Sequence, residues 1–204
     1  ENQLKEVMDR DKNRASVIIW SMANETPLSA DRLEFLTSLA ATARQTDPSR
    51  LLSAALEIHY VKGKENTITI DDPFADYLDI LSFNEYIGWY DGLATKCASI
   101  HWEITQQKPV IISEFGGGAL QGNHGGQMER WTEEYQKYLY QESLKMLDRI
   151  PQLAGTTPWI LVDFRSPKRN LPEIQDGWNR KGLVSSNGEK KKAFYVMQEY
   201  YRSK

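Results

Sequence analysis

Two short apolar runs that each end in a glutamate most constrain what this chain of 204 residues can fold into. They are residues 17–25 (VIIWSMANE) and residues 109–114 (PVIISE). Both runs are short and rich in β-branched residues, and turn-forming residues follow each of them. This pattern is typical of buried parallel strands. Glu25 and Glu114 are therefore expected at the carboxyl ends of their strands.

Strand-like runs alternate with helix-like runs along the chain. The expected strands cover residues 17–22, 51–56, 78–83, 109–113 and 157–162. The expected helices cover about residues 29–46, 92–106, 132–149 and 191–201, and the first 14 residues are also helix-like. Such alternation indicates βαβ units and a parallel sheet. We expect an open α/β sheet or part of a (β/α) barrel.

The two glutamates lie on the first and the fourth of these expected strands. In an α/β barrel the loops at the carboxyl ends of the strands build the active site. Two carboxyl groups at that rim are what glycoside cleavage needs, one as acid/base and one as nucleophile or base. Asn24 precedes Glu25, and its amide could bind a sugar hydroxyl while the carboxyl group acts on the glycosidic oxygen.

Net charge and hydropathy exclude several other classes. The formal net charge is −3, the isoelectric point is about 5.7, and basic residues are scattered except at 190–192, which opens a helix pattern. We expect no nucleic-acid partner. No apolar run reaches the roughly 18 residues of a membrane span, and no secretion signal opens the chain. No membrane partner is expected, and bacterial cytoplasm and periplasm both remain open as locations.

Cysteine and histidine usage points to no metal and no cofactor. Cys97 is the one cysteine, so an internal disulfide is impossible, and we expect it to serve packing. The histidines lack metal-ligand spacing, and no dinucleotide, phosphate-loop or zinc motif occurs. His124 lies in a glycine-rich stretch after Glu114, where it could contact a substrate. The stretches 116–130 and 165–181 are unusually long loops, which are more often functional than not.

Several strings resemble the catalytic domain of glycoside hydrolase family two. Residues 11–25 (DKNRASVIIWSMANE) resemble its acid/base region, and residues 112–116 (ISEFG) resemble its nucleophile strand. Residues 83–90 (FNEYIGWY) resemble its aromatic site strand, and residues 157–164 (TPWILVDF) resemble its last barrel strand. Residues 182–195 match its final strand-to-helix passage. The resemblance covers essentially the whole chain, in the expected order and spacing.

This resemblance implies a (β/α)8 TIM barrel of which residues 1–204 form the C-terminal part, with roughly the last five strands and their helices. The β-sandwich domains and first barrel strands of the family would be absent. It also implies a retaining mechanism, with Glu25 as general acid/base and Glu114 as nucleophile. Tyr86 would lie near the nucleophile, Asn84 would line the sugar subsite with Asn24, and Trp159 would be the sugar platform.

Residues 179–181 (NRK) bear on the identity of the sugar. Asn179 and Lys181 resemble the Asn-x-Lys pair by which β-glucuronidases bind the sugar carboxylate. An ammonium and an amide donor would satisfy a carboxylate that is costly to desolvate alone. We therefore favour a retaining exo-β-glycosidase acting on β-glucuronides, with a β-galactosidase of the same family as the alternative. A catalytically inactive barrel fragment or a carbohydrate-binding remnant is the alternative from another class.

The expected partners are a β-glycoside substrate and further protein. The first and last expected strands, 17–22 and 157–162, would each lack the neighbour that a complete barrel supplies. Unpaired apolar edges invite association. We expect an oligomer or association with the missing barrel half, unless a long loop folds over the gap and leaves a monomer.

Overall fold

The computed structural model describes residues 1–204, and the chain divides into two compact units. Unit 1 holds residues 1–84, 102–113 and 152–155, and unit 2 holds residues 85–101, 114–151 and 156–204. None of the helices combines the length and the apolar character needed to span a bilayer.

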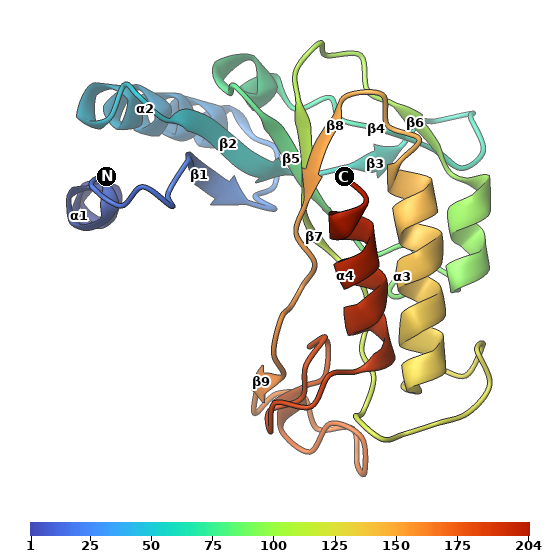
Figure 1. The fold of residues 1–204 in the computed structure, drawn as a ribbon. Coiled ribbons are helices and arrows are strands. Elements are labelled where there is room, and N and C mark those ends of the chain that lie inside the picture. Colours follow the sequence, from blue (N-terminus) through green and yellow to red (C-terminus); the bar gives the residue numbers. More distant parts are fainter. The chain divides into compact units, whose positions relative to one another are not determined.

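Helices and strands alternate along the chain, as the sequence predicts (Figure 1). The elements are α1 (Asn2–Asp11), β1 (Ile19–Asn24), α2 (Ala30–Thr46), β2 (Leu51–Leu56), β3 (His59–Tyr60), β4 (Thr67–Thr69), the 3-10 helix η1 (Pro73–Tyr77), β5 (Leu81–Glu85), the 3-10 helix η2 (Ala94–Ser99), β6 (His101–Glu103), β7 (Val110–Phe115), α3 (Glu133–Leu147), β8 (Leu153–Thr156), β9 (Phe164–Arg165), β10 (Trp178–Asn179) and α4 (Lys192–Arg202).

The main sheet has the strand order β1-β2-β5-β7-β8. Strands β1 and β2 pair in parallel with Ile19 opposite Leu51, and β2 and β5 pair in parallel with Ala55 opposite Ser82. The expected parallel α/β sheet is confirmed, and β2 has the bounds that the sequence predicts. The carboxyl-terminal residues of β5, β7 and β8 belong to unit 2, while the rest of the sheet belongs to unit 1.

In unit 1, α2 begins where the sequence predicts a cap. The Ser29 hydroxyl accepts the Arg32 amide at 3.1 Å, which satisfies one of the free N–H groups of the first turn. The Arg32 guanidinium then forms two hydrogen bonds with the Asp72 carboxylate, at 2.9 and 2.7 Å, and a third with Thr26 Oγ1 at 2.7 Å. This buried pair ties the segment after Glu25 to α2 and to the start of η1.

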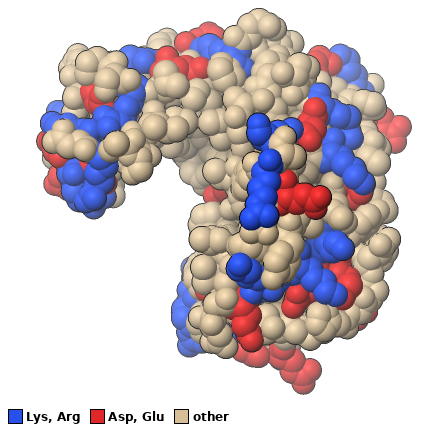
Figure 2. All heavy atoms as spheres, viewed as in Figure 1, with Lys and Arg blue, Asp and Glu red and all other residues tan.

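In unit 2, α3 and α4 lie side by side (Figure 1). Thr132 caps α3 by accepting the Tyr135 amide at 3.0 Å. Charges of both signs lie close together along α4 (Figure 2), where Lys192 pairs with Glu134. Apolar residues of α3 close over the segment after β5, with the buried cluster Trp89, Ala94, Tyr135 and Leu139.

Two of the sequence predictions are wrong in detail. The fifth strand of the main sheet, β8, ends at Thr156, so the expected strand over 157–162 is irregular. The reason is Pro158, which lies two residues beyond the end of β8. Proline restricts the residue before it and has no N–H to donate to a ladder. The expected helix over 92–106 is only the short 3-10 helix η2 followed by strand β6, which joins β3 and β4 in a second sheet.

Unit 2 also buries a carboxyl group at the end of β5. Glu85 Oε2 accepts the Ile87 amide at 2.8 Å, whereas Oε1 has no hydrogen-bond partner in the chain. The side chains of Tyr140 and Ser143, both on α3, lie near it. Burial raises the pKa of Glu85 to about 8, although the Ile87 amide opposes the shift. Glu85 is therefore protonated in the folded chain at neutral pH.

We predict that the Glu85 carboxyl group lowers the free energy of unfolding as the pH rises. A carboxyl group whose pKa is raised by folding destabilises the fold from its unfolded pKa, near 4.5, up to its folded pKa. Glu85→Gln removes this ionisation and keeps the shape. Urea unfolding should show the variant gaining a few kcal/mol over the wild type between pH 5 and pH 8. Glu199→Gln, at an exposed position of α4, is the matched control. Parallel stability curves for wild type and Glu85→Gln would contradict the assignment.

Candidate active site

Glu25 lies just beyond β1, and both its backbone and its side chain are held. Its amide donates to the Ala55 carbonyl on β2 at 2.9 Å. Asn84 Nδ2 donates to Glu25 Oε1 at 2.9 Å and to Asn24 Oδ1 at 3.1 Å. The φ angle of Glu25 is +48°, a left-handed conformation that few non-glycine residues adopt. Strained backbone of this kind is frequent at functional sites.

The Asn84 carboxamide is fixed at both ends. Ser113 on β7 donates to Asn84 Oδ1 at 2.8 Å, so the Nδ2 donors must face Glu25 and Asn24. Asn84 is buried, while the Glu25 side chain is exposed beside an open cavity of about 420 Å³. The cavity is lined by Glu25, Leu56, Glu57, Ile58 and Asn84. The structure thus brings the predicted residues Asn24, Glu25 and Asn84 together in unit 1.

Glu114 belongs to unit 2, at the end of β7, and is half-buried. The Tyr86 hydroxyl donates to Glu114 Oε2 at 2.7 Å. Burial raises the pKa of Tyr86, and the Glu114 carboxylate raises it further. The phenol therefore keeps its proton and donates to the carboxylate, which leaves the other carboxylate oxygen available for chemistry.

Lys181 lies over the ring of the same tyrosine. Its ammonium Nζ is 5.4 Å from the centre of the Tyr86 ring and 4.7 Å from that of Tyr90, and it donates to the Tyr90 hydroxyl at 2.6 Å. Lys181 is 5% exposed, and no carboxylate of the chain forms an ion pair with it. A buried ammonium without an anionic partner is costly, so this position is suited to an anionic ligand.

The orientation of the Asn179 carboxamide is fixed by the backbone of Lys181. Its Oδ1 accepts the Lys181 amide at 3.1 Å, which leaves the NH2 group as the free donor of the carboxamide. The structure therefore brings the predicted residues Tyr86, Glu114, Asn179 and Lys181 together in unit 2.

Two residues near Lys181 escaped the sequence analysis. Burial opposes ionisation of Tyr90, but the hydrogen bond and charge of Lys181 and the charge of Arg169 outweigh it and lower the pKa of Tyr90. Tyr90 closes the aromatic string 83–90, so the sequence did carry a signal for it. Arg169 stands in a loop with no pattern that singles it out.

Three glycines after β7 allow very close packing. Gly116 has φ +120°, and a Cβ atom there would lie 2.3 Å from the Tyr140 hydroxyl. A Cβ atom on Gly117 would lie 2.6 Å from Trp89, and one on Gly118 would lie 2.7 Å from Trp131. Any side chain at these positions would displace an aromatic wall next to Glu114.

A buried ion pair holds the segment that carries Asn179 and Lys181. Lys191 Nζ donates to Asp163 Oδ1 at 2.8 Å, to the Ala119 carbonyl at 2.6 Å and to the Arg180 carbonyl at 3.1 Å. Asp163 Oδ1 also accepts the Gly182 amide at 2.8 Å. The peptide groups on both sides of Lys181 are thus fixed by the buried Lys191 ammonium and the buried Asp163 carboxylate.

Trp159 follows β8 rather than lying within a strand. Its amide donates to the Phe115 carbonyl at 3.0 Å, next to Glu114 in the chain, and its half-buried ring packs edge-on against Phe164 with centroids 6.0 Å apart. Trp159 is therefore anchored to β7, although the strand expected to carry Trp159 ends earlier.

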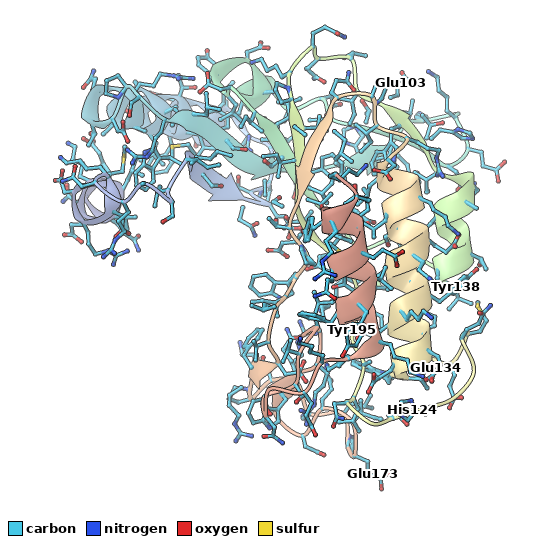
Figure 3. The ribbon with its side chains drawn as sticks, viewed as in Figure 1. Glu103, His124, Glu134, Tyr138, Glu173 and Tyr195 are labelled. Carbon is cyan, nitrogen blue, oxygen red and sulfur yellow. The ribbon has the colours of Figure 1, made fainter.

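His124 turns toward a helix end instead. Its Nδ1 lies 3.1 Å from Glu134 Oε1 at the start of α3, and Figure 3 shows the two residues at the same end of that helix. The Lys192 ammonium contacts the same carboxylate and lowers the pKa of Glu134 to about 2. His124 is thereby accounted for by a surface ion-pair cluster.

Comparison with known proteins finds a family model that runs along nearly the whole chain. The model for "Glycosyl hydrolases family 2, TIM barrel domain" matches residues 2–203. The chain is 31% identical over 204 residues to a β-glucuronidase of Paenibacillus borealis, covering 96% of the chain and 32% of that relative. It is 31% identical over 217 residues to the human β-glucuronidase, covering 97% of the chain and 30% of that relative.

Solved structures show the same fold. A β-D-glucuronidase of Dictyoglomus thermophilum superposes with a TM-score of 0.77 at 26% identity, covering 98% of the chain and 34% of that protein. A family 2 β-galacturonidase of Eisenbergiella tayi, solved with galacturonate, superposes with a TM-score of 0.80 at 23% identity, covering 100% of the chain and 36% of that protein.

The chain spans about a third of the length of the relatives it matches. Since the family model covers nearly all of its residues, the chain belongs to the glycosyl hydrolases of family 2 and holds part of their TIM-barrel domain.

Proposed function

We propose that this chain carries the catalytic residues of a retaining exo-β-glycosidase that removes terminal β-linked uronic acids, with β-glucuronides favoured. The observation that carries the proposal is the buried Lys181 ammonium, which has a phenol and two aromatic rings around it but no carboxylate. A uronate carboxylate would supply the missing charge, and the Asn179 amide would donate to it. Several relatives with β-glucuronidase activity in their names support the assignment.

The proposed chemistry uses the two glutamates in turn. The Glu114 carboxylate attacks the anomeric carbon while Glu25 gives its proton to the departing glycosidic oxygen. Water then attacks the glycosyl ester, Glu25 takes a proton from that water, and the bond to Glu114 breaks. The Tyr86 hydroxyl holds one oxygen of Glu114, and Asn84 orients Glu25. Trp159 would supply the sugar platform.

The proposal extends to what lies beyond these residues. Strands β1 and β8 are the two ends of the main sheet, and β1 is preceded by Ile18, which is 67% exposed. In unit 2, an apolar cavity of about 510 Å³ opens next to Leu161, Leu183, Phe194 and Met197, and Leu161 is 58% exposed. We propose that further barrel residues, or a second copy of the chain, cover these surfaces.

The first test separates the two glutamates. Glu114→Gln should lower turnover of a nitrophenyl β-glucuronide by at least about a thousandfold, because no glycosyl ester can form. Glu25→Gln should keep measurable activity on dinitrophenyl glycosides, whose leaving groups need little protonation. Glu34→Gln, at an exposed position of α2 in the same unit as Glu25, is the control. Full hydrolysis by Glu114→Gln would contradict the roles, and a wild-type enzyme inactive on every nitrophenyl glycoside would favour the inactive-remnant alternative.

The second test addresses the sugar. In the complete enzyme, Lys181→Met should raise the barrier for the β-glucuronide by about 2–4 kcal/mol, the scale of a lost charge-assisted contact in a desolvated site. The barrier for the β-glucoside or β-galactoside should hardly change. Lys168→Met, at an exposed position of the same loop, is the control. Preference of the wild type for the β-galactoside, with equal losses on both sugars in Lys181→Met, would favour the β-galactosidase alternative.

The third test addresses assembly. Residues 1–204 alone should oligomerise or aggregate at micromolar concentration, because apolar surface and unpaired strand edges favour association. Light scattering measures this directly. A monodisperse 23.5 kDa species with cooperative unfolding would show that the chain closes its own edges.

A further inference from the structure

The cavity at Lys181 holds more positive charge than one carboxylate can neutralise. It measures about 160 Å³ and lies wholly within unit 2. Its lining includes the aromatic residues Trp89, Tyr90 and Trp131, the three cations Arg130, Arg169 and Lys181, and no acidic residue. A single uronate carboxylate would leave two positive charges facing the same space.

The cations lie in two places along one aromatic wall. Lys181 lies over Tyr90, and the charge of Arg169 acts on the same phenol. Arg130 lies over the neighbouring ring, with its guanidinium carbon 5.3 Å from the centre of Trp89. The Trp89 and Tyr90 rings have centroids 6.5 Å apart. The wall therefore presents positive charge at two adjacent rings, with two cations at Tyr90 and one at Trp89.

The Arg130 guanidinium is fixed by one hydrogen bond and keeps further donors free. Its Nη2 donates to the Gly92 carbonyl at 2.7 Å, and its guanidinium also lies 6.0 Å from the Tyr135 ring centre. No carboxylate pairs with it, and the remaining N–H groups of its planar fork can donate to an oxyanion. Arg130 is exposed, so its end of the cavity is open to solvent. Trp131, which packs edge-on against Trp89 at 4.8 Å, forms the adjoining wall.

We propose that Arg130 and Trp131 form a second anionic subsite, so that the preferred substrate is a uronide carrying another acidic group close to its carboxylate. This rests on the proposed function, because it takes Lys181 and Asn179 as the carboxylate site. The carboxylate of a hexuronic acid is on C5, next to O4 and far from the aglycone. The second acidic group, a sulfate ester or a carboxylate, would therefore be attached through O4.

The space is sufficient for both groups. A cavity of about 160 Å³ has the volume of roughly five waters at the density of the liquid. A carboxylate and a sulfate together place five oxygens in it. Two anions facing three cations reduce the net charge of the cavity to +1, whereas a single carboxylate leaves +2.

The test compares nitrophenyl β-glucuronides that differ only at O4, using the complete enzyme. The series is the 4-O-methyl ether, the 4-O-carboxymethyl ether and the 4-O-sulfate, so bulk is present in all three and charge in two. In the wild type, kcat/KM for an anionic member should exceed that for the methyl ether by about ten- to a hundredfold, the range of a charge-assisted hydrogen bond. Which of the two anionic members is better distinguishes a sulfate from a carboxylate.

Arg130→Met should bring this ratio down at least tenfold, and Arg130→Lys should restore part of it. Arg165→Met is the matched control, because Arg165 also stacks on an indole ring, that of Trp178, yet does not line the cavity. Equal kcat/KM for the three substrates in the wild type would overturn the proposal, even if Arg130→Met failed to fold. So would an unchanged ratio in a folded Arg130→Met. The ratio compares two uronides, so it is scored separately from the uronide-to-glucoside ratio of Lys181→Met, on which the proposed function depends.

Discussion

The buried ion pair between Lys191 and Asp163 is the interaction on which the packing around Lys181 in unit 2 depends. One ammonium joins α4 to the loop after β7, through the Ala119 carbonyl, and to the segment of Asn179 and Lys181, through the Arg180 carbonyl. Burial raises the pKa of Asp163, and the charge of Lys191 opposes that shift. Removing one partner of such a pair typically costs about 3–5 kcal/mol, because the other charge is left unpaired. Three chain segments far apart in sequence would lose their common anchor.

Tyr86 contacts both the Glu114 carboxylate and the Lys181 ammonium. Its hydroxyl binds Glu114 and its ring faces Lys181. A neutral phenol can serve both, since it donates to an anion at its edge and attracts a cation to its face. The glycines that follow Glu114 let the surrounding aromatic rings approach the backbone closely. Glu114 and Lys181 thus share one aromatic frame in this unit.

The sequence was most informative where local pattern and tertiary packing agree. Strand β2, the cap of α2 at Ser29 and helix α3 appear as predicted, because their apolar spacing and capping residues carry the structure on their own. The expected helix over 92–106 failed because pairing of β6 with another strand overrides the local pattern. The end of an apolar run singled out Glu25 and Glu114, whereas Asn84 and Tyr86 were expected only from the resemblance to the glycoside hydrolase family. Arg130 and Arg169 could not, because cations in long loops acquire their meaning only from the cavity that they line.

The protonated Glu85 carboxyl group has a consequence for calorimetry. In the unfolded chain a glutamate is ionised at pH 7, whereas in the fold its pKa is about 8. Folding at neutral pH therefore takes up nearly one proton at this side chain, and the buffer must supply it. The heat of folding then includes the ionisation heat of the buffer, so phosphate and Tris should give different apparent enthalpies for the same reaction. The difference in apparent enthalpy between the two buffers therefore measures the net number of protons taken up on folding.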